Sequence, residues 1–460
     1  RLLDRGRMLV LQLSGRGLAI DRGLIACRDD GASTQVRRAA AAEADRGSPA
    51  IITRAGALTF AACIELARAR PAARCVIATP TVETIAAIHA ALAERRPLAL
   101  LHARLPAAEL DRQRALVEQA ALPANAAAVL FTSGSTGRPK GVMHSDNTLL
   151  VTARSLCRDW RIGADDVVCS LSPFSHNLGV GAALTALVAG AELVMHDTPR
   201  GESLVDRLTE TGVTYLIGVP THAMDLVAEL RRRKLARLGR LRAFRVSGAA
   251  SPPQVMHDLM AFGIEPQSGY GMTENNSHQY TRPGDDPALI AGTCGRACAG
   301  YEIGIFDPAD PDRELPRGQV GLVAGRGACL MLGYFDDQLA TEAAFNADGW
   351  FVTGDLGTLD ADGYLRITGR QKEVLIRGGH NISPARIEEL AAGHGAVARA
   401  AVLALPDARL GERICLAYVA RGGQALDAAS VLKHLAAAGL SRYEMPEFTL
   451  ALAEMPLMAN

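Results

Sequence analysis

Residues 130–147 read LFTSGSTGRPKGVMHSDN, and this stretch decides the fold. The apolar run at 126–131 predicts a buried strand, which leads directly into a loop rich in Gly, Ser and Thr. Small residues let backbone N–H groups approach an anion, hydroxyls add donors, and a lysine supplies a mobile positive charge. The loop is therefore predicted to bind a polyphosphate through Thr132, Ser133, Gly134, Ser135, Thr136, Gly137 and Lys140.

This loop differs from the Walker A pattern, in which Gly-Lys is followed by Ser or Thr. Here Arg138 and Pro139 separate Gly137 from Lys140. A flexible Gly/Ser linker is the alternative, but linkers do not follow an apolar strand or end in Pro-Lys-Gly. Another nucleotide-binding fold is therefore expected.

The pattern on both sides of the loop indicates an α/β protein with more than one domain. From residue 48, apolar strand-like runs alternate with Ala-rich helical runs, which is typical of a parallel sheet. Gly-rich β segments are expected at 292–307 and 318–337, a hairpin at 350–369, and a strand, strand and helix after 397. A short strand is expected at Met8 to Leu13. A chain of 460 residues exceeds what one core usually supports.

Composition excludes several classes of partner. Lys plus Arg equals Asp plus Glu at 49 each, so no basic surface for nucleic acid or an anionic membrane is expected. No apolar segment reaches the length of a membrane span, and the first residues lack a leader pattern, so a cytoplasmic location is expected. Cys294 and Cys298 have no matching pair for a zinc site, and the nine cysteines are expected to be reduced.

The loop TSGSTGRPKG resembles the phosphate loop of the adenylate-forming superfamily, which includes acyl-CoA synthetases, luciferases and peptide-synthetase adenylation domains. Further motifs follow in the superfamily's order: YGMTE at 270–274, TGD at 353–355 and GRQKEVLIRGGHNISP at 369–384. The resemblance implies a large AMP-binding domain of α/β sheets with a small β-barrel-like subdomain at 1–370. It also implies a small mobile α+β domain at 371–460.

The resemblance assigns roles to the YGMTE and TGD motifs. Tyr270 would stack on adenine, Thr273 would contact the α-phosphate, and Glu274 would bind Mg²⁺ together with Thr136. Asp355 would accept both ribose hydroxyls, and Arg370 would meet the ribose or phosphate. The other residues implied to line the AMP site are Gly248, Ala249, Ala250, Gly269, Gly271 and Met272. Lys140, Thr273, Glu274 and His176 are the residues with an implied catalytic role.

The segment PFSHNLGV at 173–180 and the Gly-Val-Pro turn at 218–220 resemble the acyl-binding part of the superfamily. The acyl pocket would then include His176, Asn177, Gly179 and Val219. A surface histidine that caps the next helix is the alternative for His176. PFSHNLGV contains no Asp to meet an α-ammonium group, so a substrate without a free α-amine is favoured.

The last implied roles belong to the C-terminal part. Lys372 matches the hinge on which that domain turns, and Gly378 and Gly379 would leave room for the pantetheine arm of coenzyme A; a turn before the helix PARIEELAAG is the alternative. In the superfamily, the segment that here ends in MPLMAN runs into a Gly-Lys pair whose lysine acts in adenylation. That lysine is absent from these 460 residues, and we expect the sequence to stop one or two positions before it.

Together the resemblance implies an acid–CoA ligase that uses ATP, Mg²⁺ and coenzyme A and releases pyrophosphate from an acyl-AMP-forming step. MHSDNTL, PFSHNLGV and RGGHNISP resemble ligases for medium-chain, alicyclic or aromatic acids. The alternatives are an acyl-AMP ligase that loads a carrier protein, and a half-active nucleotide-binding paralogue. The expected partners are small molecules, without nucleic acid or an integral membrane association; the acid and the oligomeric state, a homodimer included, stay open.

Overall fold

The computed structural model describes most of the chain from residue 51 onward. The described residues are 51–53, 56–59, 62, 65–66, 74–120, 122–123, 125–132, 139–196, 202–249, 251–377, 380–407, 409–423 and 426–456. The strand expected at Met8 to Leu13 lies outside them. Contacts group the described residues into two compact units: unit 1 within 1–303, 325–351 and 363–365, and unit 2 within 304–324, 352–362 and 366–460. The division into domains at residue 370 stays a prediction.

Among the described residues, the largest sheet belongs to unit 1 and has nine strands. Its strands are β1 (Ile51–Thr53), β2 (Gly56–Leu58), β7 (Val167–Ser170), β8 (Glu192–Val194), β9 (Tyr215–Gly218), β10 (Ala243–Val246), β11 (Glu265–Met272), β12 (Asn276–Tyr280) and β13 (Arg296–Ala297). Their order is β13-β12-β11-β10-β9-β7-β8-β1-β2. The central strands are parallel, whereas β2, β12 and β13 pair antiparallel at the two edges. The predicted α/β class is confirmed.

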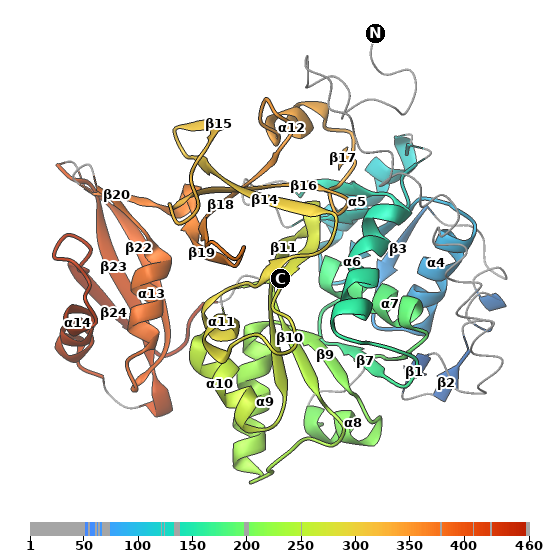
Figure 1. The fold of residues 1–460 in the computed structure, drawn as a ribbon, viewed down its shortest axis with the longest axis horizontal. Helices are drawn as coiled ribbons and strands as arrows, with labels where there is room; N and C mark the ends of the chain where they lie inside the picture. Colours follow the sequence, from blue (N-terminus) through green and yellow to red (C-terminus); the bar gives the residue numbers. More distant parts are fainter. Residues whose placement is uncertain are drawn as a thin grey trace. The chain divides into compact units, whose positions relative to one another are not determined.

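Helices cover both faces of this sheet (Figure 1). They are α6 (Asp146–Asp159), α7 (Asn177–Ala189), α8 (Leu204–Glu210), α9 (Pro220–Arg232) and α10 (Pro253–Ala261). Because successive strand residues point to opposite faces, Leu216 and Phe244 join one apolar core with α8, α9 and α10. Tyr215, Ile217 and Ala243 join a different core with α6 and α7. We call these two sides the α8–α10 face and the α6–α7 face.

A second sheet lies beyond α6 and α7. Its strands are β3 (Cys75–Ala78), β4 (Leu98–His102), β5 (Ala128–Phe131), β6 (Gly141–His144) and β17 (Gly333–Tyr334), in the order β17-β6-β5-β4-β3. The core of the α6–α7 face also contains Leu100 and Leu130 of this sheet and residues of α4 (Val82–Ala93). Helices α4, α6 and α7 therefore form a layer between the two sheets. Helix α5 (Ala107–Gln119) packs on the other side of the second sheet through Val117.

A third sheet corresponds to the predicted Gly-rich β segments and hairpin. Its strands are β14 (Tyr301–Asp307), β15 (Asp310–Glu314), β16 (Gly321–Gly327), β18 (Phe351–Leu359) and β19 (Leu365–Arg370), in the order β15-β14-β16-β18-β19. The division between the two units passes through β14, β16, β18 and β19. The sequence expectation of a β-rich subdomain after residue 292 is thus met.

The C-terminal part of unit 2 is a small α+β structure, as predicted. It contains β20 (Leu375–Arg377), β21 (His380–Ile382), β22 (Val397–Asp407), β23 (Gly411–Ala420), β24 (Phe448–Leu452), α13 (Pro384–Ala392) and α14 (Ala428–Ala437). The sheet order is β21-β20-β23-β22, and β24 pairs parallel with β23. Ile387 of α13, Ile414 of β23 and Leu435 of α14 are fully buried in one core.

The remaining short elements connect these layers. They are η1 (Thr273–Asn275), α11 (Pro287–Gly292), α12 (Gln338–Ala343), η2 (Gln371–Glu373) and η3 (Arg421–Gly423). Among the described residues, no helix combines the length and apolarity that a bilayer crossing needs, and α6 has only 14 residues.

Candidate functional site

The phosphate-loop candidates lie between two paired strands of the second sheet. β5 and β6 are antiparallel, with Phe131 opposite Gly141. Just beyond this pair, the backbone N–H of Thr132 donates to the carbonyl oxygen of Lys140 at 2.9 Å. The two ends of the loop are therefore held together. Residues 133–138 lie outside the described residues, so the roles of Ser133, Gly134, Ser135, Thr136 and Gly137 stay predictions.

Lys140, Tyr334 and Glu274 form a row beside this loop. The Lys140 Nζ lies 4.5 Å from the centre of the Tyr334 ring, and the Tyr334 hydroxyl donates to Glu274 Oε1 at 3.0 Å. Burial, and then the negative charge of Glu274, raise the pKa of Tyr334, so this hydroxyl keeps its proton. Among the described residues, no carboxylate forms an ion pair with Lys140, so its charge can meet an anionic ligand.

His144 connects the loop strand with the Thr273–Glu274 turn, and the sequence analysis did not identify it. Its Nε2 lies 2.7 Å from the carbonyl oxygen of Thr273, and its Nδ1 lies 3.0 Å from Thr148 Oγ1. Burial lowers the pKa of His144 to about 4, so the ring is neutral and its Nε2–H donates to the carbonyl. We regard His144 as a positioning residue. Its place in the MHSDNTL segment, directly after the phosphate loop, was the available signal.

The backbone of the YGMTE turn is fixed by close packing. A Cβ atom on Gly271 would lie 1.8 Å from the carbonyl oxygen of Asn276, so only glycine fits there. Asn276 has a φ of 55° and donates through Nδ2 to the carbonyl oxygens of Thr148 and Cys329. The carbonyl oxygen of Glu274 accepts from the backbone N–H of Met331 at 2.7 Å. Thr273 and Glu274 therefore sit on a rigid turn.

The residues predicted to contact adenine lie at the ends of β10 and β11. Gly248 has a φ of +91°, and a Cβ atom there would lie 3.4 Å from Val219 Cγ1. The Ser247 hydroxyl donates to the carbonyl oxygen of Gly269 at 2.9 Å, which ties the two strand ends together. Ala249 is exposed, and Ala250 lies outside the described residues. The Tyr270 ring contacts the His278 ring edge-to-face, with centroids 5.7 Å apart.

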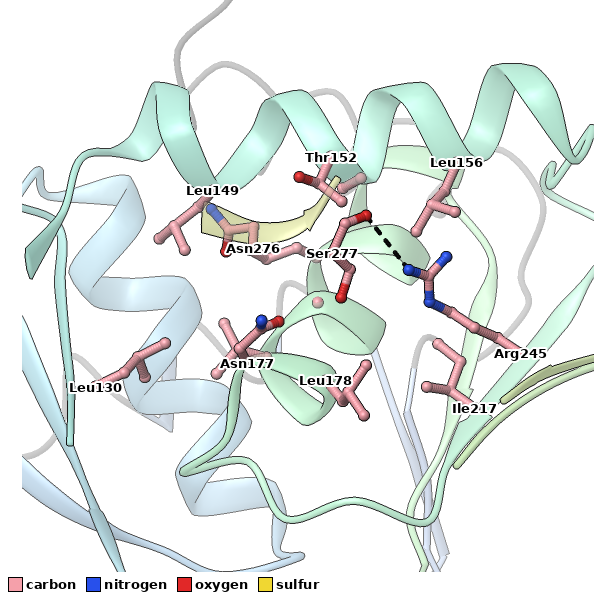
Figure 2. A pocket seen from close by; sticks show the side chains of 14 residues that line it. Leu130, Leu149, Thr152, Leu156, Asn177, Leu178, Ile217, Arg245, Asn276 and Ser277 are labelled. Carbon is pink, nitrogen blue, oxygen red and sulfur yellow. Dashed lines mark hydrogen bonds between the residues drawn. The ribbon is translucent and has the colours of Figure 1, made fainter. Parts of the chain in front are cut away.

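An apolar cavity lies in the layer between the two sheets (Figure 2). Leu149, Leu178 and Ile217 are among the residues that line it. Asn177 lines it too, and its Nδ2 donates to the carbonyl oxygen of Met272 at 2.9 Å. Asn276 is also part of the lining. The cavity therefore adjoins the turn that carries Thr273 and Glu274.

The other predicted acyl-pocket residues do not line this cavity. His176 precedes α7, and its ring contacts His102 at 5.1 Å between centroids, while desolvation and then His102 lower its pKa. His176 is exposed and is the N-cap residue of α7, as the surface alternative expects, but its side chain makes no capping hydrogen bond. A Cβ atom on Gly179 would lie 2.2 Å from the carbonyl oxygen of Pro173, so packing explains this glycine. Val219 precedes α9, and its Cγ1 would lie 3.4 Å from a Cβ atom placed on Gly248.

Arg245 lines the cavity, and the sequence analysis missed it. It lies in β10, is only 1% exposed, and points into the cavity rather than away from it (Figure 2). A charged residue in a central strand that is buried on both faces contradicts the pattern expected there. The stretch RAFRVSGAAS already carried this signal, because apolar residues flank the arginine on both sides.

The residues predicted to meet the ribose form a pair within unit 2. Arg370 Nε lies 3.1 Å from Asp355 Oδ1, and Asp355 is buried whereas the Arg370 side chain is half exposed. The Asp355 backbone N–H donates to Thr353 Oγ1 at 3.1 Å, which helps to fix the backbone from which the carboxylate extends. Lys372 is exposed in η2. Gly378 and Gly379 lie outside the described residues, so their contact with coenzyme A stays a prediction.

The side chains that could coordinate a metal can be compared with the ligands that Mg²⁺ commonly uses. Within the described part of the chain, no three His, Cys, Asp or Glu side chains gather in a way that would hold a metal. Mg²⁺ commonly uses one or two carboxylates, several waters and substrate phosphates, so the single Glu274 carboxylate fits that role. Its Oε1 accepts the Tyr334 hydroxyl, which orients the group.

Sequence and structure comparisons place this chain among proteins of known family. The model of the AMP-binding enzyme family matches residues 36–335, and that of the AMP-binding enzyme C-terminal domain matches residues 386–460. A medium-chain fatty-acid–CoA ligase of Escherichia coli is 34% identical over 72% of this chain and 58% of its own length. A 3-[(3aS,4S,7aS)-7a-methyl-1,5-dioxo-octahydro-1H-inden-4-yl]propanoyl:CoA ligase of Mycobacterium tuberculosis is 39% identical over 68% of this chain and 60% of its own length.

These matches span about six tenths of the length of the two curated relatives. Among solved structures, ATP-bound MatB from Rhodopseudomonas palustris superposes with a TM-score of 0.81 and 26% identity, covering 93% of this chain and 96% of MatB. Both family models, and the order of the motifs along the chain, agree with this likeness. The chain therefore belongs to the AMP-binding enzyme family, which is the adenylate-forming superfamily.

Proposed function

We propose that this chain is an ATP-dependent acid–CoA ligase that converts a carboxylic acid into acyl-AMP, releases pyrophosphate, and passes the acyl group to coenzyme A. The observation that carries the proposal is the apolar cavity beside the Lys140–Tyr334–Glu274 row. Asn177 belongs to the cavity wall and binds the Met272 carbonyl, so cavity and row share one rigid frame. An acid in the cavity would present its carboxylate to this frame.

The first step follows from the chemistry of the groups. A carboxylate is a poor acyl donor because its leaving group would be oxide, so it attacks the α-phosphorus of ATP and expels pyrophosphate. Lys140 would hold the phosphate charge, because no described carboxylate neutralises it. Thr273 and Glu274 would act on the α-phosphate side, where His144 holds their turn in place. Mg²⁺, when bound at Glu274, would neutralise phosphate charge.

The second step transfers the acyl group to a thiol. The coenzyme A thiolate attacks the acyl carbon of the mixed anhydride, the acyl–oxygen bond breaks, and AMP leaves. We retain Lys372 as the hinge for this step and Asp355 with Arg370 as ribose ligands, on the strength of their motifs. The exposed position of Lys372 in a short 3₁₀ turn, and the paired geometry of Asp355 and Arg370, support these assignments.

The acid is proposed to be of medium chain length, alicyclic or aromatic. The cavity wall supports this, because it is mostly made of Leu, Val, Ile and Ala side chains. A neighbouring apolar cavity shares the lining residues Leu149, Val180 and Leu184 with it, so a hydrocarbon chain would extend from one into the other. Relatives act on fatty acids and on a bicyclic propanoate, according to their names.

The test measures pyrophosphate release from ATP with a panel of such acids, together with formation of the coenzyme A thioester. A second arm supplies synthetic acyl-AMP with coenzyme A, so that the transfer step is assayed by itself. The proposal expects acid-dependent pyrophosphate release and a thioester product. If a thioester formed only when a carrier protein was supplied, the acceptor would be the carrier protein and not coenzyme A. Inactivity in both arms would contradict the proposal.

A further inference from the structure

Arg245 carries a permanent charge into an otherwise uncharged cavity. Guanidinium groups stay protonated in proteins, so burial cannot neutralise this side chain. Among the described residues that line the cavity, Arg245 alone is charged. Figure 2 shows its guanidinium at one end of the cavity and Leu130 and Leu149 at the other.

The groups around the guanidinium are neutral. Its Nη1 donates to Gln267 Oε1 at 3.1 Å, and its Nη2 donates to the carbonyl oxygen of Ser277 at 3.3 Å, the bond drawn dashed in Figure 2. The group lies over the Tyr280 ring, 5.3 Å from its centre. Within the described part of the chain, no Asp or Glu carboxylate forms an ion pair with Arg245.

Neither the nearby tyrosine hydroxyls nor the nearby carboxylate of Asp159 neutralises the positive charge of Arg245. Burial raises the pKa of Tyr215 to about 12, so its hydroxyl, which donates to Gln267 Oε1, stays neutral. Burial likewise raises the pKa of Tyr280. The Tyr280 hydroxyl donates to Asp159, but that carboxylate already pairs with Arg158 at 2.7 Å and with Arg282 at 3.5 Å.

Gly269, in the neighbouring strand β11, leaves space for the guanidinium of Arg245. A Cβ atom on Gly269 would lie 3.1 Å from Arg245 Nη2, so a larger residue in β11 would press on it. Phe244, the preceding residue, points into the α8–α10 core, where an arginine would find no cavity. The arginine is therefore placed on the one face of β10 that borders the cavity.

A buried charge without a counter-ion is costly, and an oxyanion brought by a ligand would offset that cost. We propose that the cavity binds carboxylic acids that carry a second oxyanion, such as a second carboxylate, and that Arg245 is the residue that pairs with it. This inference rests on the proposed function and specifies its substrate class. Arg245 is a specificity residue, which contacts the part of the substrate that does not react.

The spacing of the two ends suits an acid with a hydrocarbon body. Gly248, at the predicted AMP end of the strand, follows Arg245 by three residues, which corresponds to about 10 Å of extended chain. Leu178 and Ile217 line the cavity together with Arg245 and with Asn177 and Asn276, which adjoin the Thr273 turn. Activation would occur at the end near Thr273, and recognition of the second oxyanion at the end near Arg245.

The experiment compares matched pairs of acids that differ only in the second carboxylate: hexanoate with adipate, octanoate with suberate, and decanoate with sebacate. The readout is kcat/KM for pyrophosphate release by the 460-residue chain and by the Arg245→Met variant. For at least one chain length, the wild type is expected to prefer the diacid by about tenfold or more. Arg245→Met is expected to reverse that preference, and Arg245→Lys to weaken it.

Phe244→Leu provides the matched control, because it changes the adjacent residue on the α8–α10 face. It is expected to keep the wild-type ratio between diacid and monoacid. Equal ratios in the wild type and in Arg245→Met, or a wild-type preference for the monoacid at all three lengths, would overturn the inference.

Thermal unfolding separates this role from a structural one and from failure of the proposed function. Diacid without ATP is expected to raise the unfolding temperature of the wild type but not of Arg245→Met, whose unliganded stability should equal or exceed that of the wild type. This measurement needs no turnover. If no acid supports pyrophosphate release, the proposed function fails while the binding difference still decides the role of Arg245. A destabilised Arg245→Met with unchanged diacid binding would assign the arginine to structure alone.

Discussion

The two faces of the nine-stranded sheet are built from the same strands but contain different chemistry. On the α8–α10 face, Leu216, Phe244 and Val246 pack against helical Leu, Val, Met and Ala in a continuous apolar core. On the α6–α7 face, alternate residues of the same strands include Tyr215, which packs in one core with α6 and α7, and Arg245, which lines the cavity.

This difference shows how one sheet divides its tasks. The α8–α10 face stabilises the fold through close packing, which tolerates little loss of volume. The α6–α7 face keeps space and buried polar groups, which lower stability but allow a ligand to bind. Alternation along a strand therefore separates residues for stability from residues for recognition by a single position, as between Phe244 and Arg245.

The largest expected effect is a loss of stability caused by a substitution in the core of the α8–α10 face. Phe244→Ala removes a fully buried ring from a packed core, so we expect a loss of about 3–5 kcal/mol in the free energy of unfolding. Urea unfolding of the variant and wild type measures it. The ratio of activities among acids that still turn over should not change. A large change in acid preference without a loss of stability would contradict the division between the faces.

The next largest effect should come from acid, which lowers the free energy of unfolding by protonating buried histidines. His89, His144 and His278 are fully buried, and burial lowers their pKa values to about 4, 4 and 3. The unfolded chain then binds more protons below pH 6.5, so the contribution of these residues is complete above that pH and decreases as the pH falls. We expect a loss of up to about 4 kcal/mol between pH 7 and 5.5.

Urea titrations at several pH values measure this loss. His278→Phe should reduce the pH dependence by about one third, because it removes one of the three proton-binding sites. Stability that stays constant between pH 7 and 5.5 would show that these rings are not held neutral in the folded state.

A substitution of Glu274 in the Lys140–Tyr334–Glu274 row should lower activity without destabilising the apolar core. Glu274→Gln keeps an acceptor for the Tyr334 hydroxyl but removes the negative charge, so we expect about 100-fold lower kcat/KM for pyrophosphate release. The loss should be accompanied by a shift in the Mg²⁺ requirement and by little change in unfolding temperature. Glu210→Gln, at the exposed end of α8, is the control and should behave as wild type. Equal Mg²⁺ dependence in both variants would remove Glu274 from metal binding.

The smallest expected effect is a change in the KM for ATP when a residue of unit 2 is substituted. Asp355→Asn keeps one acceptor for Arg370 but cannot accept two ribose hydroxyls with a charged group, so we expect about tenfold higher KM for ATP. Initial rates at varied ATP measure it, and deoxy-ATP supplies the matched substrate control. If the variant and wild type discriminate equally between the two nucleotides, the ribose assignment fails.

Much of the fold could be predicted because its signals are local. The apolar run before the phosphate loop, the hairpin at 350–369 and the strand, strand and helix after 397 each follow from pattern, and the structure contains all of them. The family, too, follows from motifs that are contiguous in sequence. These features need no knowledge of which segments meet in space.

The site was harder to predict because its contacts are not local. His144 meets Thr273 across 129 residues of sequence, and Lys140 meets Tyr334, which no motif had singled out. Gly179 matched a family segment, yet its small size is explained by the Pro173 carbonyl that packs against it. Arg245 carried a readable signal, a charge within a buried strand, but only the assembled cavity shows what surrounds that charge.

The most direct test of the central claim is to detect acyl-AMP on the protein. The wild-type chain would be mixed with ATP, Mg²⁺ and each acid in the absence of coenzyme A, quenched, and analysed by mass spectrometry. The account predicts an adduct of acid and AMP on the wild type and a strong reduction in Lys140→Met, since Lys140 would hold the phosphate charge during its formation. Absence of the adduct for every acid, although ATP binds, or an equal amount in Lys140→Met, would contradict the account.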